Sequence, residues 1–306
     1  MDRVDIPPLV FFGTGPVAAE SLEMLAKNFS IEAVITKPTP AHHRGSAPVI
    51  DVAKELNVSV LTASSKAELD NLMAGAPVKS KLAVLIDFGI IISQEVINYF
   101  PLGIVNSHFS ILPDLRGADP ITFAILSGQK QTGVSLMKVV EAMDEGPLFS
   151  YGEFDIPDDI TTPELTHELI LLSDALLTAQ LPEIYSQKQV GLDQSITNRA
   201  VSYSKRLTKE DGVLDLKKSA VELEREVRAY IGWPGTRTKL KDLEVTIIKA
   251  HVVDGDGDIG NLTVTRDSLC IQTASQRLSI DQIKPSGKKQ MDISSFLAGY
   301  ANRLKD

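Results

Sequence analysis

The feature that most constrains the fold is a repeated alternation of short apolar runs and helical patterns over the first 189 residues. Residues 81–86 are almost continuously apolar, which is typical of a central parallel strand that is covered on both faces. Residues 9–12 and 31–36 form similar runs, and residues 162–185 carry leucines at helical spacing. Strands that alternate with helices predict an α/β fold built on an open, mostly parallel sheet.

A candidate site lies at the end of one of these strands, within residues 103–113. Asn106 and His108 are two residues apart, so both side chains project to the same side of an extended chain. An amide donor beside an imidazole suits an oxygen that gains negative charge during a reaction. Asp144 lies on an expected turn that can return to His108. On the residues alone, a strand end with ordinary hydrogen-bonded side chains stays an alternative.

Length and composition are those of a soluble globular protein with one large or two smaller domains. No apolar run approaches the roughly 20 residues of a membrane span, and the first five residues carry two acids without a signal-peptide pattern. We therefore expect a cytoplasmic protein that does not bind membranes. A single cysteine excludes an internal disulfide, and without a cysteine cluster we expect no bound metal.

The formal net charge of −9 argues against a general nucleic-acid-binding protein, which would usually be basic. Any contact with RNA must therefore come from a local positive patch, and its affinity would depend strongly on salt. An acidic chain could therefore bind RNA only through a small group of neighbouring Lys and Arg residues.

A glycine-rich turn near the start loosely matches a dinucleotide-binding fingerprint. Gly13, Thr14 and Gly15 follow an apolar run and precede a helical pattern. The next predicted strand ends in Lys37, where a nicotinamide enzyme would need an acid for the ribose. We interpret the glycines as a tight strand-to-helix turn and not as a nucleotide site.

Composition shifts after residue 189. Residues 190–206 are polar and weakly patterned, which predicts a linker between a domain of residues 1–189 and one of residues 207–306. A helical pattern over residues 220–230 is followed by short apolar runs with Gly and Asp turns, over residues 245–248, 262–265, 269–273 and 278–280. Short strands at this spacing predict a small β-barrel.

The full order of the motif residues resembles the folate-dependent formyltransferases. The matching elements are Asn106-x-His108-x-Ser110-x-Leu112-Pro113, Arg116-Gly117, Thr132-Gly133-Val134-Ser135 and Asp144-x-Gly146. The resemblance implies that Asn106, His108 and Asp144 are catalytic. It also implies a Rossmann-like formyltransferase fold for the first domain.

The second half resembles the methionyl-tRNA formyltransferases within this family. The shared segments are Tyr203-Ser204-x-Arg206-Leu207, residues 211–215, Trp233-Pro234 and residues 287–291. This resemblance implies an OB-like β-barrel that binds tRNA. Formyltransferases that act on amino-sugar nucleotides share the catalytic motif and a similar Trp-Pro domain, so they stay an alternative. A catalytically silent RNA-binding relative is a second alternative, which the intact Asn-His-Asp set argues against.

The resemblance implies a monomer that transfers a formyl group from 10-formyltetrahydrofolate to the α-amino group of methionyl-initiator tRNA. Asn106 and His108 would stabilise the oxyanion, and Asp144 would orient His108 and relay a proton. The folate would lie along Phe88, Gly89, Ile90, Ser110, Ile111, Leu112 and Pro113. The tRNA would contact Arg44, Lys205, Arg206, Lys209, Lys288 and Lys289. Two departures from the family weaken the expected tRNA contacts: the loop around Arg44 is short, and Asp119 adds negative charge beside the motif.

Overall fold

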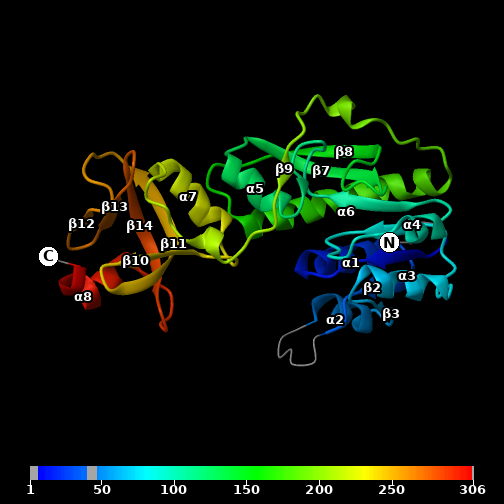
Figure 1. Cartoon of the computed structure of the whole chain (residues 1–306), viewed down its shortest axis with the longest axis horizontal. Coiled ribbons are helices and arrows are strands. Elements are labelled where there is room, and N and C mark those ends of the chain that lie inside the picture. The colour runs from blue at the N-terminus through cyan, green and yellow to red at the C-terminus, as the bar shows by residue number, and fades with distance from the viewer. Residues whose placement is uncertain (1–5, 40–46, 305–306) are drawn as a thin grey trace. The chain divides into compact units, whose positions relative to one another are not determined.

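The computed structural model describes residues 6–39 and 47–304 (Figure 1). The chain forms two compact units. The first contains the residues up to Pro120, Gln131–Asp155 and Thr166–Ser204, and the second contains Ile121–Lys130, Ile156–Leu165 and the residues from Lys205 onward. Most of the predicted linker, residues 190–204, belongs to the first unit. Within the described ranges, no helix is both long and apolar enough to cross a membrane.

The first unit is organised around a seven-stranded sheet with the order β3-β2-β1-β4-β5-β7-β8. The strands are β1 (Leu9–Phe12), β2 (Ile31–Thr36), β3 (Ser59–Thr62), β4 (Ala83–Leu85), β5 (Ile104–His108), β7 (Gln131–Lys138) and β8 (Leu148–Asp155). The first five pair in parallel, and β7 and β8 add antiparallel strands at one edge. The prediction of an open, mostly parallel sheet is confirmed. The order also reverses between β1 and β4, where ligands bind in such sheets.

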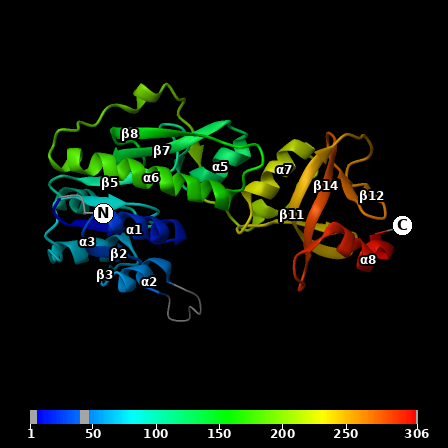
Figure 2. The same ribbon diagram turned by 180° about the vertical axis from the view of Figure 1, so that it is seen from behind.

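Helices cover both faces of this sheet. They are α1 (Pro16–Asn28), α2 (Pro48–Glu55), α3 (Lys66–Ala74), α4 (Gln94–Tyr99) and most of α6 (Thr162–Tyr185), whereas α5 (Pro120–Ser127) belongs almost wholly to the second unit. On one face, Phe12 and Ile104 share a core cluster with α3 and α4. The helix α6 runs along the other face (Figure 2). There, Ser107 Oγ lies 2.7 Å from Ser173 Oγ of α6. Since side chains alternate along a strand, Asn106 and His108 lie on the face opposite Ser107.

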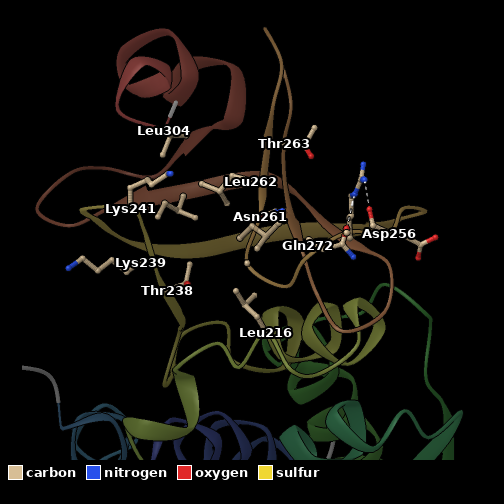
Figure 3. A pocket seen from close by; sticks show the side chains of 15 residues that line it. Leu216, Thr238, Lys239, Lys241, Asp256, Asn261, Leu262, Thr263, Gln272 and Leu304 are labelled. Atoms are coloured by element: carbon tan, nitrogen blue, oxygen red, sulfur yellow. Dashed lines mark hydrogen bonds between the residues drawn. The ribbon is translucent and has the colours of Figure 1, made fainter. Parts of the chain in front are cut away.

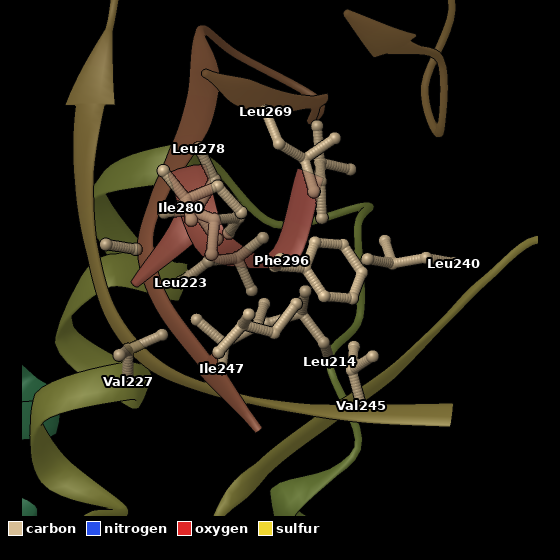
Figure 4. Packing of buried hydrophobic residues seen from close by; sticks show 14 of the residues in the cluster. Leu214, Leu223, Val227, Leu240, Val245, Ile247, Leu269, Leu278, Ile280 and Phe296 are labelled. Atoms are coloured by element: carbon tan, nitrogen blue, oxygen red, sulfur yellow. The ribbon is translucent and has the colours of Figure 1, made fainter. Parts of the chain in front are cut away.

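The second unit is a curled antiparallel sheet with the order β10-β11-β14-β13-β12, as expected for a small barrel domain. Its elements are α7 (Ala220–Ala229), β10 (Thr236–Leu240), β11 (Leu243–Val253), β12 (Leu262–Val264), β13 (Leu269–Gln272), β14 (Arg277–Pro285), β15 (Met291–Asp292) and α8 (Ile293–Leu304). Phe296 of α8 is fully buried, among Leu223 of α7 and the inward side chains of the sheet (Figure 4). Burial of this apolar surface holds the unit together.

The helix α7 begins with a capping box, which yields a stability prediction. Glu222 donates its backbone N–H to Ser219 Oγ at 3.3 Å, and Ser219 N–H donates to Glu222 Oε2 at 2.8 Å. Ser219→Ala should lower the free energy of unfolding by about 0.5–2 kcal/mol, because it removes the acceptor for one helix-terminal donor. Urea unfolding measures this loss. Ser219→Thr keeps the hydroxyl and should stay close to the parent protein; an equal loss in both variants would contradict the prediction.

Candidate active site

Three polar residues that the sequence singled out converge at the carboxyl end of β5. Asn106 and His108 are 8% and 6% exposed, and Asp144 sits in a turn with a left-handed backbone, φ 54°. Asn106 Nδ2 donates to Asp144 Oδ1 at 3.4 Å, and His108 Nδ1 lies 3.8 Å from the same oxygen. The second distance is that of an ion pair and is longer than a hydrogen bond. One carboxylate oxygen therefore faces both side chains of the strand.

The hydrogen bonds of His108 define which ring nitrogen carries a proton. Nε2 lies 2.9 Å from the carbonyl oxygen of Leu115. A carbonyl oxygen only accepts, so Nε2 is the donor and carries a hydrogen. Nδ1 is then directed to Asp144, and protonation of Nδ1 would place an imidazolium against the carboxylate. Asp144 is thus positioned to hold the ring and to stabilise its charged form.

Asp144 is fixed by groups on three other segments. Its Oδ2 accepts the backbone N–H of Gly117, in β6 (Arg116–Gly117), at 2.7 Å. Gln194, which is 5% exposed, donates to the carbonyl oxygens of Asp144 and Gly146 at 2.7 and 3.0 Å. Arg116 Nη2 in turn donates to Gln194 Oε1 at 2.7 Å. Gln194 lies in the segment predicted as a linker, so its role was missed, and only the tertiary structure reveals it.

After β5, most backbone groups of the residues predicted to bind the folate already form hydrogen bonds within the protein. Ser135 Oγ donates to Ser110 O at 2.8 Å and accepts from Leu112 N at 3.0 Å. Thr197 Oγ1 donates to Leu112 O at 2.8 Å, and Ser202 N donates to Pro113 O at 3.3 Å. Ser110, Ile111 and Leu112 are at most 2% exposed. These backbone groups therefore hold the turn in shape and are not open to a ligand.

After β4, the residues predicted to bind the folate are more accessible to solvent. Phe88 is half-buried and packs edge-on against Phe12 at a centroid distance of 5.3 Å, whereas Gly89 is exposed and Ile90 is buried. Two large apolar side chains next to predicted site residues are open to solvent: Ile91 is 65% exposed and Met143 is 64% exposed.

Asp87 is a further titratable group at this edge of the sheet. Leu85 pairs with Asn106, so the chain leaves β4 at the level of the candidate site on β5. Thr14 donates both its N–H and its Oγ1 to Asp87 O, at 3.0 and 2.7 Å. A Cβ on Gly15 would lie 2.2 Å from Asp87 Oδ2, so any larger residue there would require the Asp87 side chain to move. The glycine-rich segment is thus a tight turn packed against Asp87, as predicted.

The surroundings of Asp87 raise its pKa to about 6. Although one side of the residue is open, protein groups displace much of the water around the carboxylate, which disfavours the charged form. The Asp119 carboxylate raises the pKa of Asp87 further, and Lys37 opposes the shift. Because the folded state binds this proton more tightly than the unfolded chain, Asp87 costs stability as pH rises from about 4 to above 6.

Asp87→Asn should therefore stabilise the protein at neutral pH but not at pH 4. The difference in free energy of unfolding between variant and parent should grow as pH rises through the pKa of about 6. Urea unfolding at several pH values between 4 and 8 measures this difference. Parallel stability curves for the two proteins would show that the carboxyl group is not perturbed in the folded state.

The predicted tRNA contacts differ in their surroundings. Arg44 lies outside the described residues. Lys205 Nζ donates to Asp211 Oδ1 at 2.6 Å and, as the largest cause, lowers the pKa of Asp211 to about 2. The other four, which are Arg206, Lys209, Lys288 and Lys289, are exposed, and within the described ranges none forms an ion pair. These four are therefore free to meet phosphates.

Comparison with known proteins matches both halves of the chain to one family. Residues 8–179 match the formyl transferase family, and residues 206–301 match the formyl transferase C-terminal domain. The methionyl-tRNA formyltransferase of Roseiflexus sp. (strain RS-1) is 31% identical over 300 residues, which is 95% of this chain and 92% of the relative. The enzyme of the same name from Methylococcus capsulatus is 32% identical over 303 residues, with 96% and 97% covered.

Solved structures agree on the fold. An N-formyltransferase from Helicobacter canadensis, in complex with folinic acid and dTDP-3-aminofucose, has a TM-score of 0.69 at 19% identity and covers 94% of this chain and 100% of its own. A glycinamide ribonucleotide transformylase from Symbiobacterium toebii covers 63% of this chain, with a TM-score of 0.52 at 17% identity. The chain belongs to the formyl transferase family, and it is an enzyme that transfers one-carbon formyl groups.

Proposed function

We propose that this enzyme transfers the formyl group of 10-formyltetrahydrofolate to the α-amino group of methionyl-initiator tRNA, for translation initiation. The observation that carries the proposal is the similarity to methionyl-tRNA formyltransferases along both units. Three such relatives are 30–31% identical over 95% of the chain, including the second unit that purine-type relatives of about 60% coverage lack. Sequence identity at this level along both units favours the acceptor that these relatives are named for.

The geometry at β5 suits attack of an amine on a formyl carbon. The formyl oxygen gains negative charge as the neutral amine adds. Asn106 Nδ2 carries two hydrogens, of which Asp144 accepts one, so the second is available to this oxygen. Both nitrogens of His108 face protein oxygens in this arrangement, so His108 has no free N–H for the oxyanion and contributes by its position between Leu115 and Asp144. Asn106 is therefore the direct donor in the proposed mechanism.

Proton transfer falls to Asp144. The amine loses one proton and the departing tetrahydrofolate nitrogen gains one, so the reaction needs a group that relays a proton without net consumption. Asp144 faces both Asn106 and His108 and is held by Gly117 through its second oxygen, which keeps the carboxylate in place during the relay.

The donor would bind beside Phe88, Gly89 and Ile90. These residues follow β4, next to the catalytic strand, and the exposed Ile91 and Met143 extend the apolar surface on which a pterin ring can pack. The resemblance also predicts folate contacts at Ser110 and Leu112. The Ser110 carbonyl and the Leu112 N–H already bond to Ser135, and the Leu112 carbonyl bonds to Thr197. The folate would therefore have to share these backbone groups with the protein.

The distribution of charge supports an RNA acceptor despite the acidic chain. Residues 205–306 hold 18 of the 31 Lys and Arg residues but only 15 of the 40 Asp and Glu residues, a net charge of +3. The first 204 residues carry the remaining −12. Residues 205–306 therefore supply the excess of positive charge that RNA binding requires, and in this segment four of the six predicted tRNA contacts form no ion pair with described residues.

An amino-sugar nucleotide is the second candidate acceptor, because the Helicobacter canadensis structure with dTDP-3-aminofucose shares the fold over both units. One experiment separates the two: the enzyme is given 10-formyltetrahydrofolate with methionyl-initiator tRNA and, in parallel, with a dTDP-amino sugar, and product formation is followed. We expect formylation of methionyl-tRNA alone. Formylation of the sugar nucleotide and not of the tRNA would overturn the proposal in favour of the second candidate.

A further inference from the structure

The larger cavity of the second unit, of about 460 Å³, is bordered by polar groups that bond to one another. Leu216 lies on its wall (Figure 3). Arg277 donates to Gln272 Oε1 at 2.9 Å and to Asp256 O at 3.0 Å. These groups already have partners within the protein and do not indicate a ligand. The segment that leads to this unit, residues 192–204, instead directs polar groups at the candidate active site.

Residues 192–204, which we term the strap, are fixed to the first unit at both ends. Leu192 and Leu148 exchange two backbone hydrogen bonds, of 2.8 and 2.7 Å. At the other end, β9 (Tyr203–Ser204) pairs in parallel with β6. The segment between these two pairings therefore has fixed endpoints. Two polar side chains of the strap contact the loops that form the candidate site.

Gln194 uses every hydrogen-bonding position of its buried amide. Its Nε2 donates to the carbonyl oxygens of Asp144 and Gly146, at 2.7 and 3.0 Å. Its Oε1 accepts from Nε and Nη2 of Arg116, at 3.3 and 2.7 Å. A guanidinium only donates, so the amide oxygen must face Arg116 and the NH₂ group must face the two carbonyls. Arg116 therefore fixes the orientation in which Gln194 holds the turn of Asp144.

The turn that Gln194 holds contains Asp144 in a left-handed backbone conformation, with φ 54°. Residues with a Cβ rarely adopt this conformation, and it persists where surrounding contacts impose it. The same turn packs closely on β7, because a Cβ on Gly146 would lie 1.7 Å from Lys138 O. Both restraints act on the backbone from which the Asp144 carboxylate reaches His108.

Ser202 holds the peptide group that faces Nε2 of His108. The carbonyl oxygen of Leu115 lies 2.9 Å from this nitrogen. The N–H of the same peptide group, on Arg116, donates to Ser202 O at 3.0 Å. Ser202 Oγ also accepts the N–H of Leu115 at 2.8 Å, and Leu115 has a left-handed backbone, φ 55°. A peptide group is planar, so these bonds to Ser202 fix the direction of the carbonyl that meets His108.

We propose that the strap supplies two positioning residues for formyl transfer: Gln194 acts through Asp144, and Ser202 acts through His108. This inference rests on the proposed function, because it takes the roles of Asp144 and His108 from that mechanism. A displacement of about 1 Å at a reacting group can lower a rate by about 10²-fold. Loss of a positioning residue should therefore appear in kcat, whereas substrate binding, measured by KM, should change little.

The first test is Gln194→Met, which keeps the length of the side chain and removes its donors and its acceptor. We expect kcat to fall about 10–100-fold, with KM for donor and acceptor within about twofold of the parent. Circular dichroism and urea unfolding check that the variant folds. Ser195→Ala is the control, because it alters an exposed side chain of the same 3₁₀ turn that bonds to Asp193. The control should keep the kcat of the parent.

Gln194→Glu separates the two halves of the amide. The introduced carboxylate can still accept from Arg116, but it has no hydrogen for the carbonyl oxygens of Asp144 and Gly146. If donation to the turn is what matters, this variant should be at least as slow as Gln194→Met. A Gln194→Glu enzyme at the parent rate would show that the bond to Arg116 suffices, and would overturn the role of Gln194 in holding Asp144.

A double-mutant cycle distinguishes a positioning residue from one that only stabilises the fold. In the Asp144→Asn background, Gln194→Met should lower single-turnover rates by no more than about twofold, because no reacting carboxylate is left to position. A residue that matters only for the fold would lower the rate equally in both backgrounds. That result, or a Gln194→Met enzyme with the kcat of the parent, would overturn the inference for Gln194.

Ser202→Ala gives the corresponding cycle with His108. It removes the acceptor of the Leu115 N–H but keeps the backbone bond to Arg116, so its kcat should fall less than that of Gln194→Met. In the His108→Ala background it should cause no further loss, and an equal loss in both backgrounds would overturn its role. All rates are measured with the acceptor that the parent formylates. If that acceptor is a sugar nucleotide and not methionyl-tRNA, the proposed function is wrong, while both cycles still decide the roles of the strap.

Discussion

Replacing Asp144 with asparagine should lower kcat for formyl transfer by about 10²–10⁴-fold, with the fold unchanged. The two carboxylate oxygens both accept: Oδ1 from Asn106 and Oδ2 from Gly117. Asparagine has one oxygen and one NH₂ group, so in either orientation its NH₂ meets another donor. The variant also loses the charge that faces His108. Single-turnover rates with saturating donor, together with circular dichroism, measure the effect on chemistry and on the fold.

The neighbouring Glu145 supplies a matched control for this prediction. Glu145 Oε1 forms an ion pair with Arg116 at 3.0 Å, and its side chain is 46% exposed. Glu145→Gln removes the same charge one residue away without touching Asn106 or His108, so its rate should stay within a fewfold of the parent. If both variants lose activity equally, the loss reflects general charge near the site and not the position of Asp144.

The first unit was largely predictable because its strands are buried on both faces. Continuous apolar runs such as the one that contains β4 have few other interpretations. The strand β8 was missed because its outer half is polar and contains Gly152, which weakens a strand pattern. Gly152 is needed there for space: a Cβ would lie 2.9 Å from Leu172 of α6. That requirement comes from the packing of α6 and is invisible in the local sequence.

Two elements of the second unit were missed for a related reason. The strand β10 reads Thr-Arg-Thr-Lys-Leu, and its exposed basic residues hide the strand until its partner β11 is known. The helix α8 contains two serines and a glycine among its apolar residues, so its helical preference is weak. Burial of Phe296 in the core of the unit compensates for this preference.

In the candidate site too, some residues were predictable from the sequence and others were not. Asn106, His108 and Asp144 were identified by a long ordered motif, and the structure brings them together. Their supports were not identifiable, because Gln194 and the Leu115 carbonyl act through tertiary contacts that leave no local pattern. The motif therefore predicts the residues of the candidate site, while the groups that hold them in place follow from the tertiary structure.

Asn106→Ala should lower kcat by about 10²–10³-fold, because it removes the donor that the mechanism directs at the developing oxyanion. An interaction made mainly in the transition state affects kcat and kcat/KM for the acceptor equally, so KM should change little. His108→Ala should also lower kcat strongly, since it removes the ring that lies between the Leu115 carbonyl and the Asp144 carboxylate. Steady-state kinetics with varied acceptor measure both variants, and circular dichroism checks that the fold survives truncation of these buried side chains.

Ser107→Ala is the matched control, because Ser107 lies between the two residues on the same strand but faces α6, where its Oγ lies 2.7 Å from Ser173 Oγ. Loss of that buried hydrogen bond should cost about 1 kcal/mol of stability and leave the rate close to that of the parent. The three variants thus separate the two faces of one strand: activity should depend on Asn106 and His108, and stability on Ser107. A slow Ser107→Ala enzyme, or an Asn106→Ala enzyme at the parent rate, would mean that β5 positions the site without taking part in the chemistry.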